Sequence, residues 1–133
     1  MIVLDTHALL WWVNGDSQLS QHALQVIEHE MQADDGEILI SAISAWEIAL
    51  LVEKSRLALS MATDDWLKTV EEIEGVRFVA LDAATLVEST RLPGEFHKDP
   101  ADRMIVALAR HFNADLITAD AKITAYRHVR TVW

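Results

Sequence analysis

The alternation of short apolar runs with segments of helical periodicity is the feature that most restricts the fold of this sequence. Five apolar runs have the length of strands: 1–4, 37–41, 76–81, 115–118 and 128–133. Helical patterns separate and follow them, at 6–13, 17–33, 44–55, 63–74, 82–91, 100–112 and 121–125. Because strands that alternate with helices form right-handed β-α-β units, we predict an α/β fold with a mostly parallel sheet of four to five strands.

Composition predicts a single globular domain, residues 1–133. A hydrophobic content of 51% and a mean hydropathy of +0.13 suit a chain that buries its own core. No apolar run approaches the roughly 20 residues of a membrane span. We expect no signal peptide, because Asp5 interrupts the first apolar run. The absence of cysteine excludes disulfides and thiolate metal sites, and it suits the cytoplasm, where we expect the protein.

The charge of the chain is strongly negative and uneven. A net charge of −10 argues against general affinity for nucleic acid. Residues 1–96 carry 5 Lys and Arg against 17 Asp and Glu, whereas residues 97–133 carry 6 against 4. The acidic part is either a solvated surface or a contact area for a basic partner.

The helix predicted from Pro100 is almost wholly apolar in its second half. Residues 104–109 are all apolar, as in a buried helix. Pro100 fits the first helical position, where a missing N–H costs nothing. Asp99 and Asp102 lie three residues apart, so both fall on one face of the first turn. A buried helix with such a start either has an acidic cap or lines a site.

Acidic residues also stand at the other junctions between strands and helices. Asp5 follows the first apolar run, Glu47 opens the helix after the second, and Asp120 follows the fourth. Each has a local explanation as a helix cap; in particular, Ser44 and Glu47 match a capping box. In a parallel sheet, however, these junctions share one edge, and ligands bind at that edge in open α/β sheets.

Four carboxylates that converge at one edge would repel one another strongly. Their pKa values would rise unless a cation neutralised them. A set of oxygen ligands without thiolate points to Mg²⁺ or Mn²⁺, which can polarise a phosphodiester and lower the pKa of a bound water. The phosphate-binding patterns GxGxxG and GxxxxGK[ST] are absent. The sequence thus favours metal-assisted chemistry over nucleotide binding in a glycine-rich loop.

Four segments resemble the acidic motifs of PIN domains, in particular those of VapC-type toxins from bacterial toxin–antitoxin pairs. They are 1–7 (MIVLDTH), 41–48 (SAISAWEI), 99–107 (DPADRMIVA) and 116–120 (LITAD). The resemblance spans nearly the whole chain in the same order. It implies a three-layer α/β/α fold and a Mg²⁺- or Mn²⁺-dependent endoribonuclease, which hydrolyses RNA by a metal-activated water. It also implies a VapB-like antitoxin partner and a homodimer or a toxin–antitoxin hetero-oligomer.

The resemblance carries over residue by residue. It implies that the catalytic metal carboxylates are Asp5, Glu47, Asp102 and Asp120. Asp99 is either a fifth acidic group, a residue that supports a ligand, or only the helix cap. Thr6 and Thr118 fall where the family often places hydroxyls that orient a carboxylate or a water, although either also suits an ordinary turn or strand.

Basic and aromatic side chains near these motifs have two interpretations each. Arg103, with Lys98 and His97, flanks the expected site; Arg103 is the first candidate for a substrate phosphate contact, or else pairs with Asp99 or Glu95. Lys98, Thr6 and Thr118 are further candidates for such a contact. We interpret Trp46 and Trp66 as core or interface anchors rather than nucleotide stackers. The remaining histidines are interpreted as surface or core residues: His7, His22, His29, His111 and His128.

Two other functions compete with a nuclease. The first is a non-catalytic interaction module whose acids serve only as caps. The second is a phosphatase with Asp5 as nucleophile, but Asp5-Thr6-His7 lacks the second Asp that a haloacid-dehalogenase-type site uses. For the partner, the apolar helices around 19–33 and 43–55 offer a groove to an antitoxin helix, whose basic tail could reach the carboxylates and block metal binding.

Overall fold

A computed structural model describes residues 1–133, and their order of elements is the one that the sequence predicts. The strands are β1 (Ile2–Leu4), β2 (Ile38–Ser41), β3 (Val76–Val79), β4 (Asp115–Ile117) and β5 (Thr131–Val132). The helices are α1 (Thr6–Val13), α2 (Gln21–Gln32), α3 (Ala42–Glu53), α4 (Thr63–Glu71), α5 (Ala83–Thr90), α6 (Pro100–His111) and α7 (Ala121–Thr124). No helix is both long enough and apolar enough to cross a bilayer.

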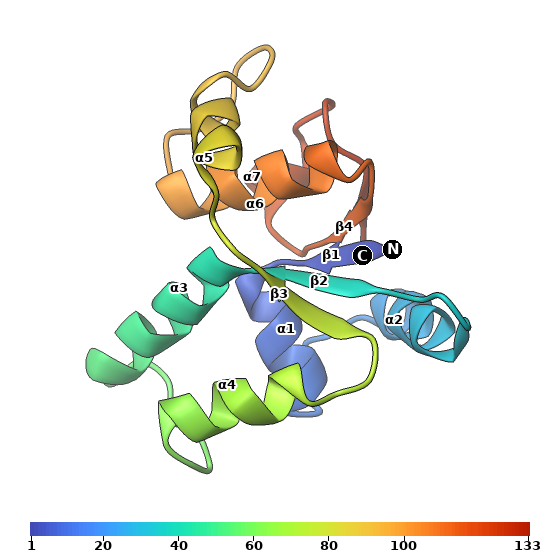
Figure 1. The fold of residues 1–133 in the computed structure, drawn as a ribbon, viewed down its shortest axis with the longest axis vertical. Coiled ribbons are helices and arrows are strands. Elements are labelled where there is room, and N and C mark those ends of the chain that lie inside the picture. The colour runs from blue at the N-terminus through green and yellow to red at the C-terminus, as the bar shows by residue number, and fades with distance from the viewer.

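The five strands form one sheet in the order β3-β2-β1-β4-β5, and every neighbouring pair is parallel. Figure 1 shows α5, α6 and α7 on one side of this sheet and α1, α3 and α4 on the other. The predicted α/β class, parallel sheet and three-layer arrangement are therefore confirmed.

The two faces of the sheet bury separate cores because successive strand residues point to opposite sides. Ile2 and Leu4 of β1 join the core under α1, α2, α3 and α4, while Val3 between them joins the core under α6. All three of these side chains are buried, as are residues 105–109 of α6. The expected burial of this helix is thus confirmed.

Several predicted element bounds are wrong, and capping side chains explain the difference. The second helix begins at Gln21 rather than Ser17, because the Ser20 hydroxyl accepts the Ala23 N–H while Asp16 closes a turn on the N–H of Gln18. The fourth helix ends at Glu71 rather than residue 74, with Glu72 as its C-cap, and Gly75 follows with φ +88°.

The correction that matters most for the site concerns the helix after β2. It begins at Ala42, and the Ser41 hydroxyl accepts the Ile43 N–H as its N-cap. Ser44, the expected cap, lies inside the helix and is fully buried. The capping box is therefore absent, and the Glu47 carboxyl is not used at the start of its own helix.

The strand ends determine where the acidic residues lie. Asp5 follows β1, α3 begins directly after β2, and Asp120 follows β4. Because β1, β2 and β4 are parallel neighbours, these chain segments meet at the carboxyl edge of the sheet. The N-terminus of α6 reaches the same edge and brings Asp99 and Asp102.

Candidate metal centre

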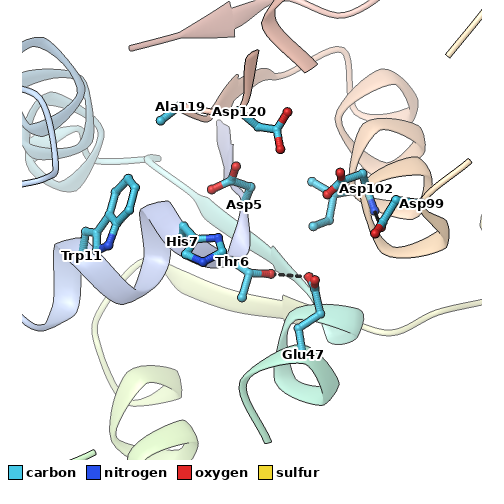
Figure 2. A pocket seen from close by; sticks show the side chains of 10 residues that line it. Asp5, Thr6, His7, Trp11, Glu47, Asp99, Asp102, Ala119 and Asp120 are labelled. Carbon is cyan, nitrogen blue, oxygen red and sulfur yellow. Dashed lines mark hydrogen bonds between the residues drawn. The ribbon is translucent and has the colours of Figure 1, made fainter. Parts of the chain in front are cut away.

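One pocket at the carboxyl edge of the sheet collects acidic side chains from four separate chain segments. Its volume is about 410 Å³. Figure 2 shows Asp5 at its centre, Glu47 on α3, Asp99 and Asp102 on α6, and Asp120 after β4. The structure thus brings together the four acids that the resemblance implies as metal ligands, with Asp99 beside them.

Asp5 is the most deeply buried of these acids, with 7% of its surface exposed. As the N-cap of α1, it accepts the Ala8 N–H through Oδ1 at 2.9 Å. The buried Thr118 hydroxyl at the end of β4 donates to its other oxygen, Oδ2. The expected role of Asp5 as a helix cap is confirmed, and the Thr118 hydroxyl fixes the orientation of its carboxylate.

Glu47 is held by residues of two helices. The Thr6 hydroxyl, in the first turn of α1, donates to Glu47 Oε1 at 2.6 Å, a bond drawn in Figure 2. Thr6 Oγ1 also lies 2.9 Å from Ser44 Oγ, one turn before Glu47 on α3. Because a hydroxyl has one proton, the Thr6 proton goes to Glu47 and Ser44 supplies the proton of the second bond. This chain of hydroxyls fixes the Glu47 carboxyl at the pocket.

The first turn of α6 contributes two acids with different partners. Asp99 is exposed and caps the helix by accepting the Asp102 N–H at 2.9 Å, while it also lines the pocket. Asp102 is partly exposed, and its Oδ2 lies 3.1 Å from His97 Nε2, at ion-pair distance but without hydrogen-bond geometry. Asp99 is therefore a helix cap that also lines the acidic pocket.

Asp120 completes the group from the exposed side. Its Oδ1 accepts the N–H groups of Lys122 and Ile123 at the start of α7. Its own N–H donates to the Thr118 hydroxyl at 3.1 Å. Thr118 therefore connects the two acids that flank β1 and β4, since it donates to one and accepts from the backbone of the other.

The crowding of carboxylates shifts their ionisation. Burial, followed by repulsion from Asp99, Asp120, Glu47 and Asp5, raises the pKa of Asp102 to about 7. Burial also raises the pKa values of Asp5 and Glu47, although the threonine hydroxyls that donate to them oppose the shift. An acidic site at neutral pH with raised pKa values is one that a cation would stabilise.

The donors fit a hydrated hard cation better than a closed metal cage. No group of three His, Asp or Glu side chains lies close enough for all three to coordinate one ion directly. Mg²⁺ normally keeps several waters and binds one or two carboxylates, with substrate phosphates completing its shell. Carboxylate oxygens spread around a pocket of about 410 Å³ suit this mode of binding, and the absence of cysteine excludes a thiolate metal site.

The expected phosphate contact by Arg103 disagrees with the structure. Its Nε donates to the Ser89 carbonyl at 2.8 Å, and one terminal nitrogen donates to the carbonyls of Phe96 and His97. Arg103 therefore ties α6 to α5 and to the preceding loop, pairs with neither Asp99 nor Glu95, and does not line the pocket. Lys98 is exposed and does not line it either.

Two histidines lie at the site: His7, which sequence reasoning assigned to the surface or core, and His97, which it placed beside the site without a partner. His7 is exposed, lines the pocket and lies 5.6 Å from the Trp11 ring between centroids. Its position two residues after Asp5, in the first turn of α1, was the available signal. The contact between His97 and Asp102 had no such signal, because it depends on how the 92–98 loop folds back.

Comparisons with known proteins identify the family of this chain. The PIN domain family model matches residues 2–129, so the chain belongs to the PIN domain family. Ribonuclease VapC22 of Mycobacterium tuberculosis is 37% identical over 134 residues, which cover 99% of this chain and 98% of that protein.

Solved structures show the same fold at lower identity. The VapBC2 complex of Rickettsia felis, bound to a promoter DNA fragment, superposes with a TM-score of 0.69 at 17% identity and covers 99% of this chain and 98% of that one. A toxin–antitoxin complex from Klebsiella pneumoniae gives 0.66 at 18% identity, covering 100% and 97%. At this level of identity, the likeness concerns the fold.

Proposed function

We propose that this protein is a Mg²⁺- or Mn²⁺-dependent endoribonuclease, the toxin of a VapBC-type pair. The observation that carries the proposal is the convergence of Asp5, Glu47, Asp102 and Asp120 from four chain segments on one pocket. The near full-length relative that is named as a ribonuclease supports RNA as the substrate. The all-oxygen donor set and the raised pKa values support the divalent cation.

The chemistry follows from the arrangement of the side chains. When bound, the divalent ion supplies Lewis acidity toward the phosphodiester and lowers the pKa of a water. One or two of the four carboxylates would bind the hydrated ion directly and the others would contact it through its waters, while the hydroxyls of Thr6 and Thr118 orient Glu47 and Asp5. The N-termini of α1 and α6 open on the pocket and favour the negative scissile phosphate through their N–H groups and dipoles.

The decisive experiment compares two aspartates with the same local role. Asp5 and Asp82 are both helix N-caps, but only Asp5 lines the pocket. We expect Asp5→Asn to abolish metal-dependent cleavage of single-stranded RNA, while Asp82→Asn cleaves like the wild type because an Asn cap costs little stability. Chelation with EDTA should stop the wild-type reaction, and Mn²⁺ should restore it. Undiminished cleavage by pure Asp5→Asn protein would refute the assignment.

Saturable metal binding separates this proposal from a non-catalytic module. A nuclease of this kind binds Mn²⁺ at the pocket and gains thermal stability from it. A module whose acids serve only as helix caps binds no Mn²⁺ and shows no shift in Tm.

An antitoxin partner is the second part of the proposal. The solved structures of the same fold include one that is named as a toxin–antitoxin complex. The strong negative charge of residues 1–96 suits a basic partner segment. The apolar helices predicted to receive an antitoxin helix are α2 and α3. Co-expression with the adjacent reading frame and affinity capture test it. A stable complex that lacks RNA cleavage is expected, and full activity with no bound protein would contradict it.

Three further expectations belong to the same proposal. The chain works as a single domain over residues 1–133. It acts in the cytoplasm, which its lack of cysteine suits. It assembles as a homodimer or, with its antitoxin, as a hetero-oligomer, and light scattering of the protein alone and of the complex distinguishes these states.

A further inference from the structure

A second cavity, of about 680 Å³, continues from the carboxylate pocket along α3. The two cavities share four lining residues: Thr6, His7, Glu47 and Asp99. We call the second cavity the α3 groove. One wall is α3 and the other is the start of α6 with Leu81, and the four shared residues connect the groove to the carboxylate pocket.

On the α3 side of the groove, an aromatic, an aliphatic and a basic side chain follow one another along the helix. Trp46, Leu50 and Lys54 recur every four residues, so they form one stripe along the helix. From Trp46 to Lys54 the stripe is about 12 Å long at 1.5 Å per residue. It therefore runs from an aromatic ring beside Glu47 to a positive charge at the far end of α3.

Trp46 is unusual because its side chain is the largest apolar group that the fold leaves open. It is 58% exposed, whereas Trp66, the other tryptophan expected to be an anchor, is 3% exposed in the core. The expectation that both tryptophans anchor a core or an interface holds only for Trp66 within this chain. An indole face beside the catalytic pocket is a suitable platform for an unpaired base.

The far end of the groove is positively charged. Lys54 and Arg56 line it, both are exposed, and neither takes part in an ion pair within the chain. Their placement is fixed by the end of α3, where Ser55 has φ +57° and the Arg56 N–H donates to the Leu51 carbonyl. Two unpaired cations in a chain of net charge −10 complement a phosphate backbone.

We propose that the α3 groove binds the nucleotide next to the cleaved bond in single-stranded RNA. The base stacks on Trp46, and its neighbouring phosphate contacts Lys54 and Arg56. This inference rests on the proposed ribonuclease function and assigns a substrate-binding surface to it. Stacking accepts any base, so the groove selects unpaired RNA rather than a particular sequence.

Kinetics with tryptophan variants test the stacking contact. We expect Trp46→Ala to raise KM for a short single-stranded RNA about tenfold with kcat within about twofold, as loss of one stacking contact predicts. Trp46→Phe keeps a stacking ring and should retain most of the affinity, whereas Trp46→Leu keeps only apolar surface and should resemble Trp46→Ala. Met61→Ala is the matched control, since Met61 is 42% exposed and does not line the groove.

Fluorescence separates this inference from the proposed function. RNA added to Asp102→Asn protein, which is expected not to cleave, should quench tryptophan emission. The quenching should be largely lost when Trp46→Phe is added to that background. Quenching without cleavage by the wild type would support the groove and refute the nuclease. Cleavage with a KM that is unchanged in Trp46→Ala would refute the groove and keep the nuclease.

The cations are tested by salt dependence. Lys54→Ala and Arg56→Ala should each weaken RNA binding and reduce the slope of log K against log salt by about 0.7, as loss of one single-strand phosphate contact predicts. Arg91→Ala is the control, because Arg91 is exposed and does not line the groove. If these variants bind RNA normally but fail to hold the antitoxin, the groove is a protein-docking surface and the proposal is wrong.

Discussion

The two edges of the parallel sheet differ in how their charged side chains are arranged. At the amino edge, charges are paired: Arg130 Nε lies 2.7 Å from Asp115 Oδ1, an Arg77 nitrogen lies 3.6 Å from Glu37, and the N-terminal ammonium pairs with Glu30. At the carboxyl edge, carboxylates face one another, and the single ion-pair contact is between His97 and Asp102.

This contrast separates stability from function. A fold gains little from exposed ion pairs, but it loses stability when like charges are held together in a partly buried pocket. The hydroxyls of Thr6 and Thr118 nevertheless hold those charges in place. The charges at the carboxyl edge therefore suit a ligand, whereas those at the amino edge pair residues at the starts of neighbouring strands.

Replacement of Asp102 should give the largest effect and separate the two properties most clearly. We expect Asp102→Asn to reduce RNA cleavage more than about 100-fold, because loss of a group that only orients a metal ligand already costs about 10–100-fold. The metal-free variant should melt higher than wild type at pH 8, by about 4 °C per kcal/mol of repulsion removed. Cleavage assays and calorimetry measure the two changes. A variant that is both active and less stable would contradict the contrast.

Removal of the Thr118 hydroxyl should have the next largest effect. Thr118→Val leaves an Asp5 oxygen without its donor in a buried position, so we expect about 10–100-fold lower cleavage. Unfolding free energy should fall by about 1–3 kcal/mol, the usual cost of an unsatisfied buried group. Thr118→Ser, which keeps the hydroxyl, should recover most of the activity. Equal loss in both variants would mean that the methyl group, not the hydroxyl, matters.

In the metal-free protein, the carboxylates at the carboxyl edge should make the stability depend on pH. Burial raises the pKa of Asp102 to about 7 and also raises the pKa values of Asp5 and Glu47. Between their ordinary values near 4 and these raised values, the folded state binds more protons than the unfolded state. Stability is therefore lost as pH rises through this window, and Tm should be lower at pH 8 than at pH 5.

Metal and a variant provide the controls for that pH profile. Saturating Mn²⁺ should raise Tm at pH 8 more than at pH 5, because binding requires deprotonated carboxylates. Asp102→Asn should flatten the metal-free profile. The lowered pKa values of Glu30 and Asp82 act only below about pH 5, so they do not mask the trend. A Tm that rises between pH 5 and pH 8 without metal would contradict the origin assigned to it.

The amino edge should give the smallest effect. Arg130→Gln removes an exposed ion pair and a bond to the Asn113 side chain, so we expect a loss of less than about 1 kcal/mol in unfolding free energy. RNA cleavage should remain at the wild-type level, since Arg130 lies at the opposite edge from the pocket. A drop of tenfold or more would show that this edge takes part in substrate binding.

Local patterns predicted the acidic positions better than the details around them. Asp5 and Asp120 could be placed because each follows a buried strand, and parallel strands end at a common edge. Glu47 was attributed locally to a capping box, but Ser41 caps α3 and leaves Glu47 for Thr6. A four-residue pattern cannot decide between two serines three residues apart when each can begin a helix.

The basic residues around the site were less predictable still. Arg103 follows Asp102 directly, which suggested a phosphate contact, but three backbone carbonyls take up its guanidinium. Those carbonyls become available only because α5 and the loop at 96–97 pack against α6. Trp46 differs from its prediction in the opposite direction. A large apolar side chain is typical of a protein core, but the position of Trp46 on α3 leaves it exposed beside the pocket.

The order of strands and helices, the parallel sheet and the edge at which the acids collect were determined by the sequence alone, because hydrophobic periodicity and chain direction are local properties. Tertiary structure decided how deeply each carboxyl is buried, which hydroxyl orients it and where the α3 groove opens. These properties depend on partners as far apart as Asp5 and Thr118, which are 113 residues distant in the chain. Only packing brings such residues together, so no local pattern can specify them.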